Sequence, residues 1–334
     1  MLLLLLTGCQ ILSRLTGDPA QAAADAQALL IKGDLAGATA AYDKALARYP
    51  TDVDVVSGAA YLRLLMEDAA GAESILAAAE GAAGPRAGEI TLRRALVALD
   101  AGDLDRVKTL ALASNLPVGK LLAAEVQLAD GYRDQGKELL QQVASTPGPV
   151  GDTATQYLAL INDPNVFVAG LSETQALWAL GQRNIAVRSV ADLVKAYAES
   201  HEDGATQLLL WAGRAAVVGE VAVADDLLDA ITVPPTGQGW RVAATRGIAR
   251  CAEGKGAECQ QIFDSLAAGS PADGLADARA TAAQAVASAD PDAARALLAG
   301  LTGDAAARVW ANLGDLPKAA SVAADPFFKL QLGG

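Results

Sequence analysis

The segment that covers residues 33–50, GDLAGATAAYDKALARYP, constrains the fold of this chain more than any other part of the sequence. After a Gly-Asp turn it places a small residue, an aromatic residue and another small residue at helical spacing, namely Ala38, Tyr42 and Ala45. Side chains at this spacing share one face of a helix, so the helix can approach a neighbour closely at the alanines. Pro50 ends the helix because proline has no N–H to donate. The segment therefore predicts the second helix of a tightly packed helical hairpin.

The same order of turn, small residue and apolar residue recurs along the chain in a degraded form. Its turn positions lie near residues 33, 67, 102, 131, 181, 219, 254, 289 and 314. The chain is similar to the tetratricopeptide-repeat family, whose hairpins repeat about every 34 residues. The resemblance extends from Pro19 to Pro326. It implies an all-α fold, a right-handed α-solenoid of about eight to nine helix-turn-helix hairpins.

The alternative interpretation is an alanine-rich helical protein with loose periodicity, for which the fold class is still all-α. The composition, with 52% hydrophobic and 4% aromatic residues, suits either interpretation. Alternating β-branched runs are scarce, so no sheet is expected.

One interval, between the turns near residues 131 and 181, breaks the period. It contains two loop signals, TPGPVGDT and NDPNVFVAG, with an apolar stretch between them that predicts one extra short helix. We therefore expect an N-terminal solenoid at residues 19–147, an irregular insert or hinge at residues 148–170, and a C-terminal solenoid at residues 171–334.

The charge balance excludes nucleic acid as the expected partner. The chain has 26 basic and 39 acidic residues, which gives a formal net charge of −13 at pH 7. Such a chain repels a polyanion unless a basic stripe offsets the charge, and the sequence shows no such stripe.

The first residues, MLLLLLTGCQ, resemble the end of a bacterial lipoprotein signal. Leu6-Thr7-Gly8-Cys9 fits the order of an apolar residue, two small residues and cysteine. The resemblance implies cleavage before Cys9 and acylation of Cys9, which would anchor the protein to a membrane. Residues 1–9 are then the signal segment and residues 10–18 a short tether.

This N-terminal segment departs from a complete signal because it has no basic residue and few apolar ones. We interpret it as a start annotated too far downstream; the alternative is a cytosolic protein with an apolar N-terminus. Because Gln10, and not aspartate, follows the cysteine, the enterobacterial sorting rule favours the outer membrane, with the protein facing the periplasm.

Two further cysteines, Cys251 and Cys259, flank a Gly-Lys-Gly turn in the segment CAEGKGAEC. Sel1-like relatives of the repeat family link hairpin helices by disulfides, and the resemblance implies such a bridge here, which an exported protein permits. The alternative is a pair of free, buried thiols. No third cysteine or nearby histidine completes a zinc site.

No enzyme constellation is recognisable in this sequence. The single histidine, His201, follows a predicted helix end, where an imidazolium is favourable to the helix dipole. No phosphate-binding glycine loop or nucleophile elbow is present. We therefore expect no catalysis, no cofactor and no metal. The four tryptophans are interpreted as packing residues.

The predicted first helices of the hairpins are apolar on more than one side, which is typical of helices buried on several faces. Either the superhelix fills its own groove, which we favour, or the groove holds an apolar partner segment. The candidate groove residues are Tyr61, Leu65, Leu96, Leu128, Trp178 and Leu209.

The leading functional hypothesis is a non-catalytic scaffold, an envelope lipoprotein that supports assembly of an envelope complex. Its partners would be other envelope proteins, and a membrane through the lipid on Cys9. One alternative is a periplasmic chaperone-like binder of apolar or extended segments. Another is a cytosolic repeat regulator without lipid.

Overall fold

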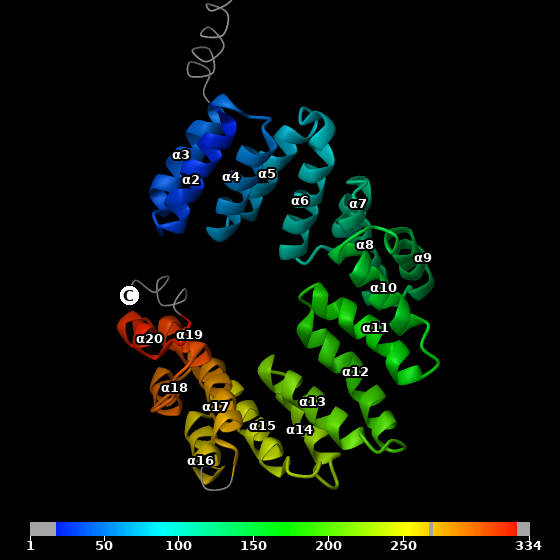
Figure 1. The fold of residues 1–334 in the computed structure, drawn as a ribbon, viewed down its shortest axis with the longest axis vertical. Coiled ribbons are helices and arrows are strands. Elements are labelled where there is room, and N and C mark those ends of the chain that lie inside the picture. The colour runs from blue at the N-terminus through cyan, green and yellow to red at the C-terminus, as the bar shows by residue number, and fades with distance from the viewer. Residues whose placement is uncertain (1–17, 267–269, 326–334) are drawn as a thin grey trace, which may run out of the picture. The chain divides into compact units, whose positions relative to one another are not determined.

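The computed structural model describes residues 18–266 and 270–325, and no strand occurs within these ranges. The chain divides into two compact units, residues 1–162 and residues 163–334. Each unit is a stack of helical hairpins, in which sequential helices pack against one another (Figure 1). The fold is therefore the predicted all-α solenoid of hairpins.

From residue 18 onward, unit 1 contains ten helical segments, one of them a short 3-10 helix: α2 (Pro19–Ile31), α3 (Leu35–Arg48), α4 (Val53–Leu65), α5 (Ala69–Glu80), η1 (Gly84–Arg86), α6 (Ala87–Asp100), α7 (Leu104–Ala113), α8 (Pro117–Ala129), α9 (Arg133–Val143) and α10 (Pro149–Ile161). Unit 2 contains α11 (Val166–Ala179), α12 (Arg183–Ala198), α13 (Gly204–Val217), α14 (Val221–Asp229), α15 (Gly239–Ala252), α16 (Gly256–Leu266), α17 (Ala272–Val286), α18 (Pro291–Leu297), α19 (Asp304–Asn312) and α20 (Leu316–Val322).

The predicted turns join the two helices of each hairpin. In most of them a glycine with positive φ follows the first helix, as Gly33 does at φ 77°. The next residue then returns its N–H to a carbonyl of the last helical turn, as in the bond from Asp34 to Leu29 at 3.0 Å. This is the Schellman geometry that glycine adopts without strain. In the hairpin of α4 and α5, Glu67 takes the same place with φ 60°.

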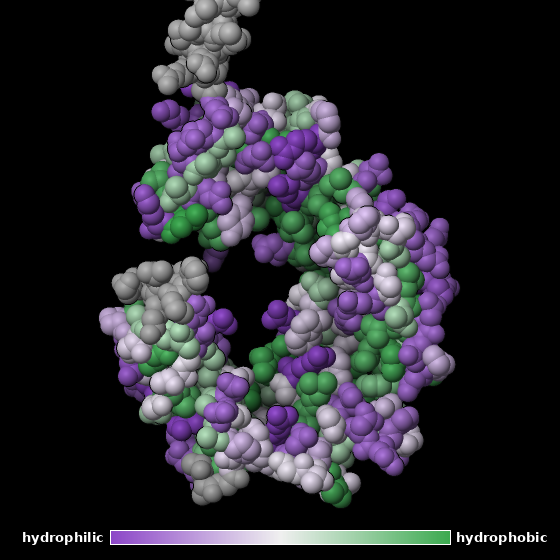
Figure 2. Space-filling model, viewed as in Figure 1, coloured by the Kyte–Doolittle hydropathy of each residue, from purple (hydrophilic) through white to green (hydrophobic). Residues whose placement is uncertain are grey.

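The small and apolar positions of the second helices form the contact within each hairpin. Ala38 is fully buried, and Tyr42 and Ala45 are each 4% exposed. The corresponding residues of α5, Ala72 and Leu76, are buried as well. The exposed side of α9 is polar, and hydrophilic residues dominate it in Figure 2. The repeat register read from residues 33–50 is therefore that of the structure.

The region expected as an irregular insert, residues 148–170, is mostly helical. The expected extra helix forms as α10, which runs for 13 residues from Pro149. Helix α11 starts at Val166, before the expected start of the C-terminal solenoid at residue 171. Asn165 explains the early start, because its side chain accepts a hydrogen bond from the N–H of Phe167 and caps the helix.

In the described part of the chain, no helix combines the length and apolar character needed to cross a bilayer. Cys9, residues 10–17 of the predicted tether and Pro326 lie outside the described residues.

Candidate functional site

Three of the four candidate groove residues of unit 1 are open to solvent. Tyr61 on α4 is 56% exposed, Leu65 on the same helix 49%, and Leu96 on α6 48%. A groove filled by its own helices would cover these side chains, so the self-filled interpretation does not hold at these positions. Tyr61 borders a cavity of about 580 Å³ whose wall also includes Gln27 and Leu30 of α2.

Two candidate groove residues are instead part of the packed interior. Leu128 on α8 is fully buried because Gly136 lets α9 approach it: a Cβ at Gly136 would lie 2.8 Å from Cγ of Leu128. Leu209 on α13 is 7% exposed, whereas the next residue, Leu210, is 47% exposed. Leu128 is therefore a contact within its hairpin, and Leu209 forms the floor of a cavity.

That cavity, of about 570 Å³, lies in unit 2. First helices of successive hairpins form its wall, and α13, α15 and α17 contact one another in this order. Leu210 and Val217 are exposed at its edge, the latter at 55%. The residues that line it are Trp178, Thr206, Leu209, Leu210, Gly213, Arg214, Val217, Gln238, Trp240, Arg241, Ala244, Thr245, Ile248, Gly274, Asp277, Ala278 and Thr281. We call this cavity the unit 2 groove.

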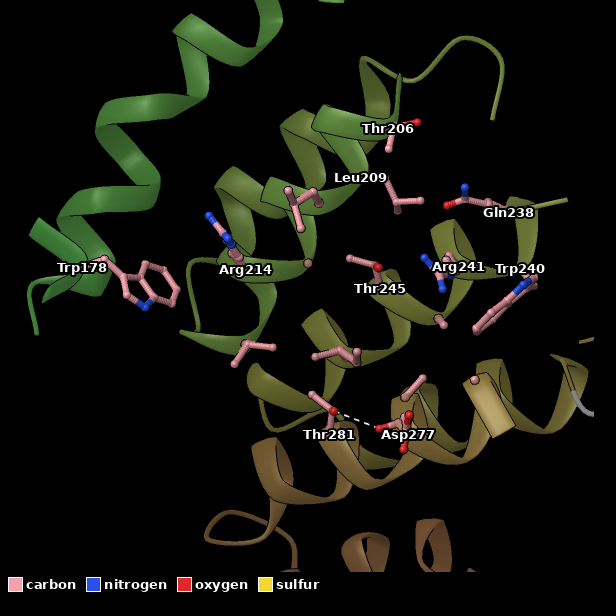
Figure 3. A pocket seen from close by; sticks show the side chains of 17 residues that line it. Trp178, Thr206, Leu209, Arg214, Gln238, Trp240, Arg241, Thr245, Asp277 and Thr281 are labelled. Carbon is pink, nitrogen blue, oxygen red and sulfur yellow. Dashed lines mark hydrogen bonds between the residues drawn. The ribbon is translucent and has the colours of Figure 1, made fainter. Parts of the chain in front are cut away.

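Two tryptophans lie at opposite ends of the unit 2 groove, with two arginines between them (Figure 3). Trp178 is at the end of α11, and Trp240 is in the first turn of α15. The Trp240 ring is placed by Gly274 of α17, where a Cβ would come within 2.6 Å of it. The glycine therefore makes room for an aromatic wall.

Each arginine of the groove lies over an aromatic ring. The Cζ atom of Arg214 is 4.3 Å from the ring centroid of Trp211 and 5.6 Å from that of Trp178. Arg241 lies 5.5 Å from the ring of Trp240. Such cation–π contacts hold the guanidinium groups in place and leave their N–H groups free to donate.

Neither groove arginine has an acidic partner within ion-pair distance among residues 18–266 and 270–325. Other arginines of unit 2 do: Arg250 pairs with Asp225 at 2.7 Å, and Arg188 pairs with Glu220. Burial beside the tryptophans lowers the pKa of Arg214 below its ordinary value, but a guanidinium stays charged at neutral pH. The groove therefore presents two unpaired cations over an apolar floor in an acidic chain.

A second, smaller cavity of about 320 Å³ adjoins the unit 2 groove. It shares Trp178 and Arg214 with the groove and is otherwise lined by Trp211 and residues of α11, such as Leu171 and Thr174. Trp178 therefore contributes to both cavities, and the accessible surface continues from α11 to α17.

Cys251 and Cys259 are joined by a disulfide that links α15 to α16. Their Cα atoms are 5.3 Å apart, and both residues are fully buried. The separation lies in the range that a disulfide spans without backbone distortion. The bond therefore fixes the helix that carries Trp240 and Arg241 to its hairpin partner.

The His201 side chain packs against Tyr197 of the preceding helix. Its ring stacks on Tyr197 with centroids 3.8 Å apart, and Nδ1 lies 2.9 Å from the Tyr197 carbonyl oxygen beyond the end of α12. Over the described ranges, no group of three or more histidine, cysteine, aspartate or glutamate side chains is placed to hold a metal ion.

Comparison with known proteins assigns neither a family nor a function to this chain. No family model matches the sequence, and no curated protein matches it. A tetratricopeptide-repeat protein from Parabacteroides merdae aligns over 79% of this chain and 98% of its own, with 12% identity and a TM-score of 0.38. The structure of Naa15/Naa10 bound to HypK-THB aligns over 94% of this chain and 58% of its own, with 15% identity and a TM-score of 0.32. The repeat architecture of this chain therefore rests on its own packed helical hairpins.

The sequence prediction missed both groove arginines and Trp240. Trp211 and Trp310 are buried, as expected for packing residues, but Trp178 and Trp240 line the groove. The available signal was local: Arg241 directly follows a tryptophan, and Arg214 follows Trp211 by one helical turn.

Proposed function

We propose that this protein is a non-catalytic interaction protein whose unit 2 groove takes up an apolar segment of a partner protein. The observation that carries the proposal is the groove itself, which keeps Leu210, Val217 and two tryptophans accessible. Contiguous apolar surface in such a cavity is typical of a binding site, because soluble proteins rarely leave it uncovered.

This proposal favours one of the alternatives from the sequence, a chaperone-like binder of apolar or extended segments, over a scaffold that acts only through its outer faces. The support is that first helices of both units carry exposed apolar side chains: Tyr61 and Leu65 on α4, and Leu210 on α13. Among the described residues that line the unit 2 groove only Trp178 and Trp240 are aromatic, which suits a contact of modest affinity.

A dye titration tests the proposal. The neutral apolar dye N-phenylnaphthylamine should bind the wild-type protein with a rise in fluorescence, and an unfolded carboxymethylated polypeptide should displace it. The double variant Leu210→Gln, Val217→Gln should weaken the binding of the dye and of the polypeptide by several-fold, because it adds amides to the groove edge without touching the core. The matched control is Val233→Gln, since Val233 is 73% exposed outside the groove. If the double variant bound the dye as tightly as the Val233→Gln control, the unit 2 groove would not be the binding site.

The cellular setting rests on the sequence alone. We infer an envelope lipoprotein acylated at Cys9, because Leu6-Thr7-Gly8-Cys9 fits the lipoprotein signal. Expressed behind a complete lipoprotein signal peptide, the wild-type chain should incorporate labelled palmitate and sediment with membranes, and Cys9→Ser should do neither. Palmitate incorporation by Cys9→Ser would contradict the assignment.

A further inference from the structure

We propose that the segment bound in the unit 2 groove is an acidic apolar peptide, whose carboxylate side chains pair with Arg214 and Arg241. This inference rests on the proposed function and adds the chemistry of the ligand. It follows from the charges and from the position of the two arginines.

The first step is that neither groove arginine forms an ion pair within the described residues. Arg214 and Arg241 are exposed in the groove, and neither pairs with a carboxylate of the described residues. By contrast, Arg246, on the same helix as Arg241, pairs with Asp229. The chain has 39 acidic residues, yet these two arginines of one apolar groove lack an acidic partner. They are therefore available to bind a carboxylate.

The second step is that the arginines are held in place before a ligand arrives. The guanidinium of Arg214 lies over the ring of Trp211 and near that of Trp178, and the guanidinium of Arg241 lies over the ring of Trp240. The planar guanidinium can stack through its face and still donate from its edge to a carboxylate. Little side-chain entropy then remains to be lost on binding, which favours affinity.

The third step concerns the size of the ligand. Arg214 lies in the last turn of α13, whereas Arg241 lies in the first turn of α15. Apolar residues of the cavity, among them Ala244 and Ile248, line the wall with them. A small anion would meet one cation and leave the apolar surface bare. A peptide with apolar side chains and separated carboxylates can meet both cations and cover that surface.

The groove also contains one acid, Asp277 of α17, and the hydroxyls of Thr206 and Thr245. The Thr281 hydroxyl, at the same wall, is used within α17, because it donates to the Asp277 carbonyl at 2.9 Å. The Asp277 carboxylate and the threonine hydroxyls provide acceptors for peptide N–H groups. A peptide backbone therefore finds acceptors where its carboxylates find donors.

The experiment uses the full chain and three acetylated, amidated peptides of about twelve residues, the length that spans several helices when extended. The peptides share leucine and phenylalanine positions and differ only in having aspartate, asparagine or lysine between them. Binding is measured by displacement of N-phenylnaphthylamine. The aspartate peptide should bind about tenfold more tightly than the asparagine peptide, as expected for a charge-assisted hydrogen bond, and the lysine peptide most weakly.

The double variant Arg214→Gln, Arg241→Gln should remove the difference between the aspartate and asparagine peptides while the neutral dye still binds. Arg188→Gln is the matched control, because Arg188 pairs with Glu220 on α14 and does not line the groove. Arg241→Lys should retain part of the preference, since it keeps the charge. Circular dichroism and tryptophan fluorescence confirm that each variant is folded.

Equal binding of the aspartate and asparagine peptides to the wild-type protein would overturn the inference and leave the proposed function standing. Failure of both the dye and the peptides to bind would overturn both. The wild-type protein could instead bind phosphatidylglycerol vesicles in preference to the aspartate peptide. If the double arginine variant lost this vesicle binding, the ligand of the groove would be an anionic lipid surface and not a peptide. If Arg188→Gln lost the preference for the aspartate peptide to the same extent, the net charge of the protein, and not the groove, would determine that preference.

Discussion

Glu125 on α8 is a carboxylate that the fold keeps without a cation. It is mostly buried, and it accepts a hydrogen bond from the hydroxyl of Tyr157 on α10 at 3.2 Å. No lysine or arginine of the described ranges forms an ion pair with it. Burial raises the pKa of Glu125 from 4.5 to about 7, and the hydrogen bond from Tyr157 offsets only part of this rise. The charged form of Glu125 is therefore unfavourable in folded unit 1.

Replacing Glu125 with glutamine should stabilise unit 1 at alkaline pH. A pKa that rises from 4.5 to about 7 on folding means that the ionised carboxylate costs the folded state at most about 3 kcal/mol. Below pH 4.5 both states are protonated and the cost is absent. Between pH 4.5 and 7 the folded state retains a proton that the unfolded state has lost, so stability falls as the pH rises. Glu125→Gln should show no such fall.

Urea unfolding at a series of pH values measures this difference. All four tryptophans, at residues 178, 211, 240 and 310, lie in unit 2, so their fluorescence follows unit 2 alone. Circular dichroism follows both units, and the transition without a fluorescence change belongs to unit 1. Near pH 8 this transition should move to higher urea in Glu125→Gln, while the fluorescence transition stays in place.

The matched control is Glu138→Gln, because Glu138 is an exposed carboxylate on the neighbouring helix α9. It should leave the unit 1 transition unchanged at every pH. The reasoning would be refuted if wild-type and Glu125→Gln proteins unfolded together near pH 8. It would also be refuted if the gain of the variant were the same below pH 4.5 as above pH 7.

Two further predictions concern the hairpins of unit 1. Glu67 has φ 60°, a conformation that glycine adopts more readily, so Glu67→Gly should stabilise unit 1 by about 1 kcal/mol in urea unfolding; a loss of stability would mean that the Glu67 side chain contributes more than its backbone costs. Ala38 is fully buried between α2 and α3, so Ala38→Leu should destabilise unit 1 by about 1–3 kcal/mol through overpacking. An unchanged midpoint for Ala38→Leu would contradict the close approach of these helices.

The hairpins could be predicted from the sequence because their determinants are local. A glycine turn, a capping aspartate and a small residue one turn later lie within a few residues of one another, as Gly33, Asp34 and Ala38 do. The cap is visible in the structure, where the Asp34 side chain accepts a hydrogen bond from the N–H of Gly37 at 2.8 Å. Such signals survive the degradation of the repeat motif. The right-handed twist of the solenoid stays a prediction.

The groove could not be predicted residue by residue, because the first helices are apolar on several sides. Leu209 and Leu210 are adjacent leucines, yet one forms the floor and the other is exposed, and the helices packed against α13, namely α12, α14 and α15, decide which. The contact of Arg214 with Trp178 joins residues from different hairpins, so no local spacing encodes it. The residue pattern predicts where a surface is apolar, whereas tertiary packing selects which side chains remain on it.

The disulfide between α15 and α16 makes the integrity of the groove wall dependent on redox conditions. The bond spans a sequence separation of 8 residues, for which chain entropy gives about 2.5 kcal/mol of stabilisation. A reductant removes this contribution from the hairpin that holds Trp240 and Arg241, although it touches neither residue. The population of protein able to bind a ligand is thereby coupled to the thiol–disulfide potential of its surroundings.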